Sequence, residues 1–308
     1  MIEGAVFKCA TGGVRLDAAL LVQFPTSTRA FCREACEDGA VKVNGRVANK
    51  GLKLRGGDTV EVAALAEVSD NRIAPDKSVR PRCIFEDDAI LAFDKPAGLP
   101  VQPLSRKETG TLMNGVVARW PAVAEVGDQP LMAGAVHRID AGTSGLVLVA
   151  RTGAAWEKMR AQFADRKVEK TYLALVEGAV AAGGTLVNHL VHDPYLPYCK
   201  MVDVSRARFA PRMEPMEAVT RFVPVAQTRC GNESRTILEV TIFTGVTHQI
   251  RAQLAMAGMH VVNDRLYGAF AVEGQIGHCL HSLSAKFAHP VSGDPVEIRT
   301  DYPEWARK

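Results

Sequence analysis

Residues 133–151 read Ala-Gly-Ala-Val-His-Arg-Ile-Asp-Ala-Gly-Thr-Ser-Gly-Leu-Val-Leu-Val-Ala-Arg. Three charged side chains, His137, Arg138 and Asp140, stand before a Gly-Thr-Ser-Gly turn, and the apolar run 146–150 after it predicts a buried strand. The glycines permit positive φ and close approach of another backbone, so the turn can hold Asp140 on a tight loop facing a cleft. This pattern leaves two roles open for Asp140. It is either a hydrogen-bonding turn residue, the commoner case, or a carboxylate that does chemistry.

Three further blocks accompany this stretch along the chain. They are Lys95-Pro-Ala-Gly-Leu-Pro-Val101, Lys170-Thr-Tyr172 and Thr247-His-Gln-Ile-Arg251. Residues 137–146 fall between the first and second of these blocks. The four stretches in this order resemble the RluA-like family of RNA pseudouridine synthases, whose signature is His-Arg-Leu-Asp, two variable residues and Thr-Ser-Gly. The resemblance covers roughly residues 80 to 305.

Composition places the chain among ordinary globular proteins. Its 308 residues, 47% hydrophobic and 23% charged, are enough for a sizeable core and favour two units over one. A net charge of +3 neither demands nor excludes a nucleic-acid partner. Seven scattered cysteines without a Cys-x-x-Cys pair argue against a disulfide framework and a zinc site, and no stretch approaches the ~20 apolar residues of a membrane span. We therefore expect a cytoplasmic enzyme.

The N-terminal part predicts a small unit of its own. Apolar residues recur at helical spacing over 16–24, a second helix is expected over 29–37, Asn44-Gly45 predicts a hairpin between strands at 41–43 and 46–47, and a last strand is expected over 59–62. This succession resembles the RNA-binding fold named after ribosomal protein S4. The expected domains are residues 1–66 for RNA binding, 67–80 as a linker and 81–308 for catalysis.

Basic residues crowd the second helix and the hairpin of this unit. Arg29, Arg33, Lys42 and Arg46 predict a patch that binds RNA phosphates, if they share one face. The alternative is an ordinary solvated surface, because acidic residues are interleaved with them. The hairpin arrangement favours RNA binding.

After residue 80 the pattern is one of short strands and few helices. Strands are predicted at 83–95 (two, around an acidic turn), 168–176, 185–191 (an edge strand), 236–243 and 280–287, and helices at 156–166 and from a Thr247 cap to Ala257. The lack of βαβ regularity favours an α+β fold with a mixed, mainly antiparallel sheet. The resemblance implies a long bent sheet with the active cleft across its middle. The basic segment 195–217 predicts a functional loop.

The resemblance implies the isomerisation of uridine in RNA, with no metal and no cofactor. That chemistry needs one carboxylate near the anomeric carbon, as nucleophile or as base, and Asp140 matches it. Arg251 matches the cation that keeps this carboxylate ionised in a dry cleft. Tyr172 matches the tyrosine that stacks on the base, its alternative being an ordinary core aromatic. We expect the Arg251 guanidinium within about 4 Å of the Asp140 carboxylate, with Tyr172 lining the same pocket.

Further positions are expected to bind substrate or to support the site. Ile250 would pack on the other side of the base, His137 and Arg138 would hold the motif loop or the flipped-out nucleotide, and Thr143 would fix the loop at the substrate. Two residues depart from the family pattern. Val246 stands where the family usually has Arg, and Asn263 where it usually has Gly.

The sequence thus predicts a monomeric RNA uridine isomerase. Its expected substrate is large-subunit ribosomal RNA first and transfer RNA second. One rival is an inactive RNA-binding or ribosome-assembly factor, which would leave Arg251 in solvent and Asp140 capping its own turn. The other is a glycosidic hydrolase, which would need a second carboxylate that is not apparent beside the signature.

Overall fold

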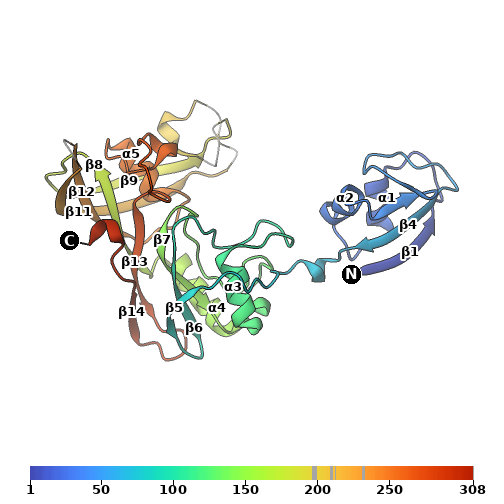
Figure 1. The fold of residues 1–308 in the computed structure, drawn as a ribbon, viewed down its shortest axis with the longest axis horizontal. Helices are drawn as coiled ribbons and strands as arrows, with labels where there is room; N and C mark the ends of the chain where they lie inside the picture. Colours follow the sequence, from blue (N-terminus) through green and yellow to red (C-terminus); the bar gives the residue numbers. More distant parts are fainter. Residues whose placement is uncertain (196–199, 209–210, 212, 231–232, 308) are drawn as a thin grey trace. The chain divides into compact units, whose positions relative to one another are not determined.

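The structure is a computed structural model that describes residues 1–195, 200–208, 211, 213–230 and 233–307. The chain forms two compact units (Figure 1). One consists of Met1–Arg72 with Leu104–Lys107, and the other of Ile73–Pro103 with Glu108–Lys308.

The first unit is a four-stranded antiparallel sheet with two helices. Its elements are β1 (Ile2–Lys8), α1 (Leu16–Gln23), α2 (Arg29–Glu37), β2 (Val41–Val43), β3 (Arg46–Val47), β4 (Thr59–Leu65) and the 3-10 turn η1 (Val68–Asp70), with strand order β1-β4-β2-β3. Helix α2 begins after Thr28, whose side chain accepts from the Phe31 N–H. Asn44 and Gly45 both have positive φ, as a tight hairpin turn requires. These local signals explain why α2 and the hairpin lie where they are predicted.

Strand β1 has no counterpart in the sequence prediction. It pairs with β4, with Ile2 opposite Leu65 and Lys8 opposite Thr59. Only three of its seven side chains are half-buried, and they do not alternate strictly, because Gly4 adopts a φ of +63° within the strand. Pairing with β4 therefore determines this strand more than its own pattern does.

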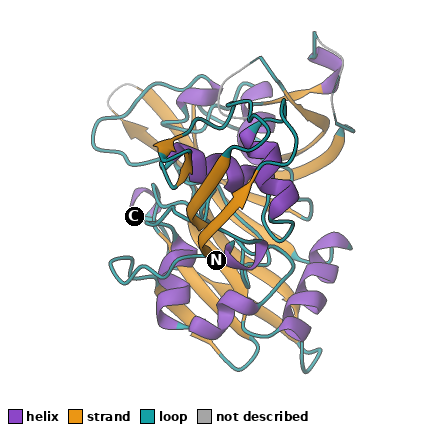
Figure 2. Ribbon diagram, turned by 90° about the vertical axis from the view of Figure 1, so that its right-hand side faces the viewer, coloured by secondary structure: helices purple, strands orange, loops and turns teal. Residues whose placement is uncertain are grey.

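The second unit is built on a sheet of ten strands. Its elements are β5 (Arg82–Glu86), β6 (Ile90–Lys95), α3 (Leu112–Arg119), η2 (Pro121–Glu125), β7 (Ser144–Ala150), α4 (Gly153–Ala164), β8 (Glu169–Glu177), β9 (Gly184–His192), β10 (Met201–Asp203), η3 (Val204–Arg206), β11 (Met216–Cys230), β12 (Glu233–Ile242), α5 (Gln249–Met256), η4 (Arg265–Tyr267), β13 (Leu280–Ala288), β14 (Pro295–Arg299) and η5 (Glu304–Ala306). The strand order is β10-β9-β11-β12-β8-β13-β7-β6-β5, with β14 beside β13. Figure 2 shows strands as the main element of this unit, with the helices beside them.

All strand pairs of this sheet are antiparallel except β7 with β13. The predicted α+β fold with a mixed, mainly antiparallel sheet is confirmed. The largest core cluster packs residues of β6, β7, β8 and β12 against α3 and α5, and includes Phe93, Leu112, Val147, Val240 and Leu254. The apolar run after the signature is thus the buried strand β7.

The glycines of the signature allow close contact at the parallel pair. Gly145 has a φ of +104°, and a Cβ there would lie 2.2 Å from the carbonyl oxygen of Ser282 on β13. A Cβ at Gly142 would lie 2.8 Å from the ring of His278. A side chain at Gly145 would push β7 away from β13, and one at Gly142 would displace the loop from His278. This packing holds the Asp140 loop against the start of β13.

Helix α5 does not begin as predicted. Thr247 is not its cap: the helix begins after His248, which has a φ of +53° and makes no capping bond with its side chain. The Gln249 side chain orders the preceding turn instead, because its oxygen accepts from the Val246 N–H and from the Thr244 hydroxyl. The expected cap pattern did not predict this arrangement, because the accepting oxygen belongs to Gln249, inside the helix, and not to a residue before it.

Two expectations about residues 185–217 have different outcomes. Strand β9 is not an edge strand, because Met201–Asp203 of β10 pair with its last residues. Short strands of three residues carry little local signal, which explains the error. Residues 196–199, 209–210 and 212 of the predicted functional loop lie outside the described residues, so that role stays a prediction.

Membrane-spanning helices and metal-binding clusters are both absent from the described part of the chain. No helix there is long and apolar enough to cross a membrane. Nor do three or more His, Cys, Asp or Glu side chains within it gather in a group that could hold a metal ion.

Candidate active site

The signature loop opens into a cavity of about 460 Å³ in the second unit. Most of its walls come from residues 136–140 and Thr143 around the signature, Arg160 and Phe163 of α4, Lys170 and Tyr172 of β8, and residues 245–251 before and within α5. Three of the four motif blocks thus contribute to one cavity. Lys95, from the remaining block, lies behind the loop, where its Nζ donates to the carbonyl oxygens of Pro96, Leu99 and Ala141.

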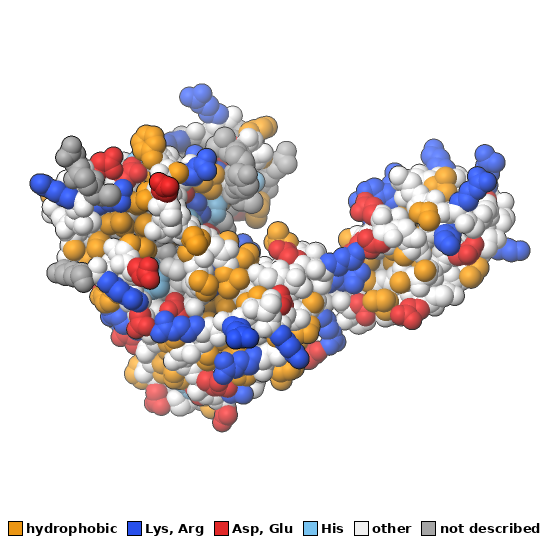
Figure 3. All heavy atoms as spheres, in the orientation of Figure 1, with side chains coloured by type: hydrophobic (Ala, Val, Ile, Leu, Met, Phe, Trp, Pro, Cys, Tyr) orange, Lys and Arg blue, Asp and Glu red, His pale blue; other side chains and the backbone are white. Residues whose placement is uncertain are grey.

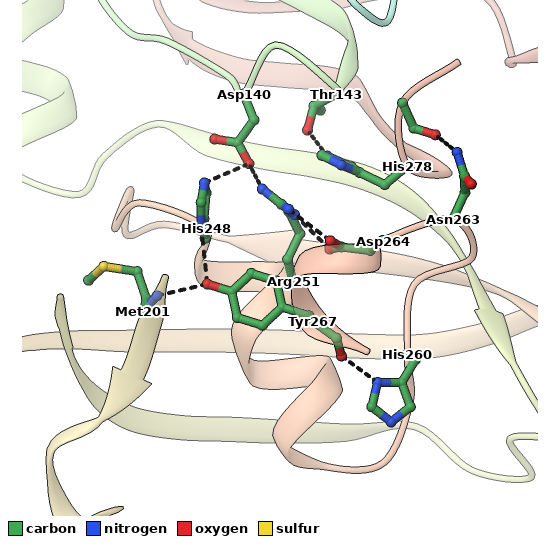
Figure 4. Close-up of polar contacts among 11 residues, drawn as sticks. Asp140, Thr143, Met201, His248, Arg251, His260, Asn263, Asp264, Tyr267 and His278 are labelled. Atoms are coloured by element: carbon green, nitrogen blue, oxygen red, sulfur yellow. Dashed lines mark hydrogen bonds and ion pairs between the residues drawn. The ribbon is translucent and has the colours of Figure 1, made fainter. Parts of the chain in front are cut away.

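Asp140 and Arg251 meet in this cavity as the sequence predicts. Arg251 Nη1 donates to Asp140 Oδ2 at 2.8 Å. The other edge of the guanidinium is held by Asp264, with Nε 2.7 Å from Oδ2 and Nη2 2.8 Å from Oδ1 (Figure 4). Arg251 is 6% exposed and Asp264 2% exposed. The buried cation is therefore shared by two carboxylates, and only one of them faces the cavity.

Charge keeps the Asp140 carboxyl ionised. Its burial alone would raise its pKa, but the neighbouring His248 and Arg251 outweigh this and leave the pKa below its usual value. The paired carboxylates in turn raise the pKa of Arg251 against the effect of burial. Oδ1 of Asp140 has no hydrogen-bond partner among the described residues. The site thus holds a carboxylate with one oxygen anchored and the other available to a ligand.

His248 faces the same oxygen of Asp140, with Nε2 3.8 Å from Oδ2. Its Nδ1 lies 3.2 Å from the Tyr267 hydroxyl, which accepts from the Met201 N–H (Figure 4). These contacts orient the imidazole so that Nδ1 faces the Tyr267 hydroxyl and Nε2 faces Asp140. Burial lowers the pKa of His248, against the effect of the neighbouring Asp140, which raises it.

Tyr172 and Ile250 line the cavity and also belong to the main core cluster. Tyr172 is 6% exposed, and its hydroxyl is hydrogen-bonded to Ser282. Burial raises the pKa of Tyr172 to about 12, so the phenol is protonated at neutral pH. Tyr172 therefore both lines the cavity and packs in the core, so its position agrees with both expectations.

The structure places His137 and Thr143 in contacts that hold the loop. His137 Nε2 accepts from the Leu148 N–H, and the ring stacks on Phe163 with centroids 5.1 Å apart. Thr143 Oγ1 lies 2.7 Å from His278 Nε2. Both side chains nevertheless line the cavity, as does the exposed Arg138. Their binding of substrate stays a prediction.

Several contributors to the site have no recognisable signal in the sequence. Asp264 and Tyr267 lie in a segment without regular pattern, and only the fold brings them beside Arg251. The departure at Asn263 has a structural reason. This residue has a φ of +66°, a conformation that Gly and Asn tolerate, and its side chain bonds to Val272 and Gly277.

In the first unit, three of the arginines surround one carboxylate. Asp17 is fully buried, and the Nε atoms of Arg15, Arg33 and Arg29 lie 3.0, 3.1 and 3.6 Å from its oxygens. The hydrogen bond from Arg15 contributes most to lowering the pKa of Asp17. The guanidinium groups stay about half exposed, so Arg29 and Arg33 serve this contact and still face solvent.

Lys42 and Arg46 are exposed on the hairpin of the first unit. Figure 3 shows Lys and Arg side chains over the visible surface of this unit, with Asp and Glu between them. The positive charge is therefore distributed, and it is not one uninterrupted patch on the face shown.

Comparison with known proteins gives the family. The sequence matches the RNA pseudouridylate synthase family over residues 89–256 and the S4 domain over residues 14–60. It is 34% identical to ribosomal large subunit pseudouridine synthase D of Xanthomonas campestris, over 98% of this chain and 90% of the relative. It is 31% identical to an uncharacterized RNA pseudouridine synthase of Aquifex aeolicus, over 97% of this chain and 93% of the relative.

A solved structure shares the fold. Human RNA pseudouridylate synthase domain containing 1 superposes with a TM-score of 0.58 at 21% identity, over 75% of this chain and 87% of that one. Together with the sequence matches and the carboxylate held in the cavity, this places the chain in a known class of isomerase. The chain belongs to the RNA pseudouridylate synthase family, whose members convert uridine in RNA to pseudouridine, and it carries an S4 domain.

Proposed function

We propose that this enzyme acts on uridines of large-subunit ribosomal RNA and that Asp140 is its catalytic carboxylate. The choice of RNA is supported by the names of its relatives from Xanthomonas campestris and Xylella fastidiosa, both called ribosomal large subunit pseudouridine synthase D. Transfer RNA is the second candidate. Such a substrate places the enzyme in the cytoplasm, and we expect it to act there as a monomer.

The observation that carries the catalytic assignment is the Asp140 to Arg251 ion pair inside the cavity. The reaction breaks the bond from N1 of uracil to C1′ of ribose, joins C5 to C1′, and moves one proton from C5 to N1. An ionised carboxylate at the sugar starts this sequence either as a nucleophile at C1′ or as a base at C2′. The free Oδ1 of Asp140 suits both roles, while Arg251 and His248 hold Oδ2.

The two rival functions lose support at the same site. An inactive factor was expected to leave Arg251 in solvent, whereas its side chain is buried against Asp140. A glycosidic hydrolase needs a second working carboxylate. The nearby candidate, Asp264, has both oxygens bound to Arg251 and does not line the cavity.

Mapping of pseudouridines tests the proposed substrate. Ribosomal and transfer RNA from cells with and without this gene should differ at positions in large-subunit ribosomal RNA. Re-expression of the wild-type chain should restore those positions, and the Asp140→Asn chain should not. A difference confined to transfer RNA would reject the ribosomal assignment.

We further propose that Tyr172 and Ile250 enclose the flipped-out uracil. Tyr172→Phe should then slow single-turnover product formation on the order of a hundredfold, because the hydroxyl is lost while the ring remains. That hydroxyl would relay the proton, with its oxygen taking up the C5 proton while its own proton passes to N1. RNA affinity should stay near that of the wild type.

Ser282→Ala is the matched control for this substitution. It removes the hydrogen-bond partner of the Tyr172 hydroxyl but leaves the hydroxyl in place. We expect it to cost stability with a much smaller loss of rate. Equal single-turnover rates for Tyr172→Phe and wild type would assign Tyr172 to the core alone.

We also propose the division of labour between the domains that the sequence suggests. Residues 1–66 would bind RNA through Arg29, Arg33, Lys42 and Arg46, residues 67–80 would link, and residues 81–308 would catalyse. Lys42 and Arg46 are the informative pair, because neither has an ion-pair partner among the described residues and Arg29 and Arg33 also hold Asp17.

The double variant Lys42→Gln with Arg46→Gln should therefore weaken RNA binding and reduce its salt dependence. Loss of two phosphate contacts should lower the slope of log affinity against log salt by roughly 1.4, since each contact contributes about 0.7 for single-stranded RNA. Lys286→Gln, which removes a lysine paired with Glu169, is the control. A slope equal to that of the wild type would contradict this role for the hairpin.

A further inference from the structure

Lys170 is a buried lysine that the proposed mechanism does not use. It is 6% exposed, lies on β8 and lines the cavity that holds Asp140. Its ammonium group has three N–H donors, and the structure shows one hydrogen bond, from Nζ to the Thr244 carbonyl oxygen at 2.7 Å. Nζ also lies 5.5 Å from the centroid of the Phe163 ring.

Lys95 shows by contrast what a structural lysine needs here. Its ammonium is fully buried, and it donates to three carbonyl oxygens, which matches its three N–H groups. Lys170 has one such acceptor and faces an open cavity. Two of its donors are therefore left for a ligand.

No carboxylate of the described residues pairs with Lys170. Burial alone lowers its pKa to about 8. Its surroundings are positive as well: after burial, Lys170 and Arg160 are the groups that lower the pKa of His137, to about 3. A buried charge without a partner is costly. This end of the cavity would be stabilised by an anion.

The position of Lys170 relative to Tyr172 suggests which anion. The two residues are two apart on one strand, so their side chains leave the same face of the sheet about 7 Å apart. That separation is comparable with the distance between a base and its own backbone phosphate. A uracil packed on Tyr172 would place a phosphate at Lys170. Arg160 lines the same cavity and is exposed, and within the described residues its guanidinium makes one hydrogen bond, from Nη1 to the Val136 carbonyl oxygen.

We propose that Lys170, with Arg160 beside it, binds a backbone phosphate next to the target uridine and so sets the position of the flipped-out nucleotide in the cavity. This rests on the proposed function, because it takes RNA as the ligand and Tyr172 as the wall that receives the base. The competing account is that Lys170 has only a structural role, in which its hydrogen bond to the Thr244 carbonyl oxygen holds the turn before α5.

Neutralising single phosphates separates these two accounts. A synthetic RNA hairpin that copies a mapped target site would be made in three forms: unmodified, with a methylphosphonate on the 5′ side of the target uridine, and with one on the 3′ side. Dissociation constants and single-turnover rates would be measured with the wild type, Lys170→Met and Lys167→Met. Lys167 is an exposed neighbour paired with Asp165, so its substitution controls for the change in charge.

One of the two methylphosphonates should weaken wild-type binding by about tenfold or more, as expected for a charge-assisted contact. Lys170→Met should bind this modified hairpin as tightly as it binds the unmodified one. Lys167→Met should lose as much affinity for the modified hairpin as the wild type does. In Arg160→Met the methylphosphonate should weaken binding less than it does in the wild type. Because Arg160 is on the surface, this variant tests the proposal even if Lys170→Met unfolds. Equal losses in wild type, Lys170→Met and Arg160→Met would overturn the proposal.

Failure of the underlying function would look different. In that case the wild type would leave the unmodified hairpin unconverted. If the wild type converts the unmodified hairpin, but each methylphosphonate weakens binding equally in the wild type and in Lys170→Met, then only the phosphate site is rejected.

Discussion

Asp140→Asn is expected to abolish pseudouridine formation. The amide has the shape of the carboxylate and can still accept a hydrogen bond from Arg251, but it has no charge with which to attack C1′ or remove a proton from C2′. We expect the single-turnover rate to fall on the order of a thousandfold or more, as it does when a catalytic group is removed from other enzymes. Quantifying pseudouridine in a defined RNA after a single turnover measures this.

RNA binding should survive this substitution, since most contacts with RNA lie elsewhere. The control is Asp301→Asn, a carboxylate in a surface ion pair with Arg82, where the change should cost little. The melting temperatures of both variants would show whether they fold. Turnover of Asp140→Asn within tenfold of wild type would remove Asp140 from the mechanism.

Asp264→Asn is expected to damage both the fold and the activity. Two of the three guanidinium nitrogens of Arg251 bind Asp264, and the group is almost fully buried. An amide cannot neutralise this charge. Removing one partner of a buried ion pair typically costs about 3–5 kcal/mol of unfolding free energy. Denaturant unfolding of the full chain measures that loss.

The activity of the folded fraction should fall as well, because Arg251 would no longer be held where it anchors Asp140. Arg251→Lys separates charge from geometry. Lysine keeps the positive charge but lacks the planar fork that meets two carboxylates at once, so we expect reduced single-turnover rates in this variant too. If Asp264→Asn had the same unfolding free energy and single-turnover rate as the wild type, Asp140 alone would suffice to position Arg251.

The charge arrangement is the reason why we expect the site to need both carboxylates. A lone arginine facing Asp140 would be free to leave its rotamer when substrate enters. Asp264 fixes the guanidinium from behind, so that Asp140 Oδ2 stays anchored and Oδ1 stays turned to the cavity. The single carboxylate that the family pattern requires is therefore supported by a second one that does no chemistry of its own.

Much of the first unit could be predicted from the sequence because its signals are local. Helix α2 and both hairpin strands have the predicted bounds, since a capping side chain and an Asn-Gly turn act within a few residues. Strand β1 could not be predicted, because it is held by pairing with β4 more than fifty residues away. The Thr247 cap failed for the same kind of reason, since contacts of Gln249 with Val219 and Thr220 shape that turn.

The sequence alone predicted the residues that we propose for the chemistry, because the signature turn, the apolar strand after it and the blocks that contain Tyr172 and Arg251 are local patterns. The contacts among these residues depend on the tertiary structure. Asp140 and Arg251 are 111 positions apart, and no local interaction brings them into contact. The sheet does so by placing β7 beside β13 and α5 over the cavity, and burial then makes each charge depend on the other. The partners Asp264 and Tyr267 follow from that packing, as does the ammonium of Lys170, which pairs with no carboxylate of the described residues, because burial and unmet hydrogen bonds exist only once the chain has folded.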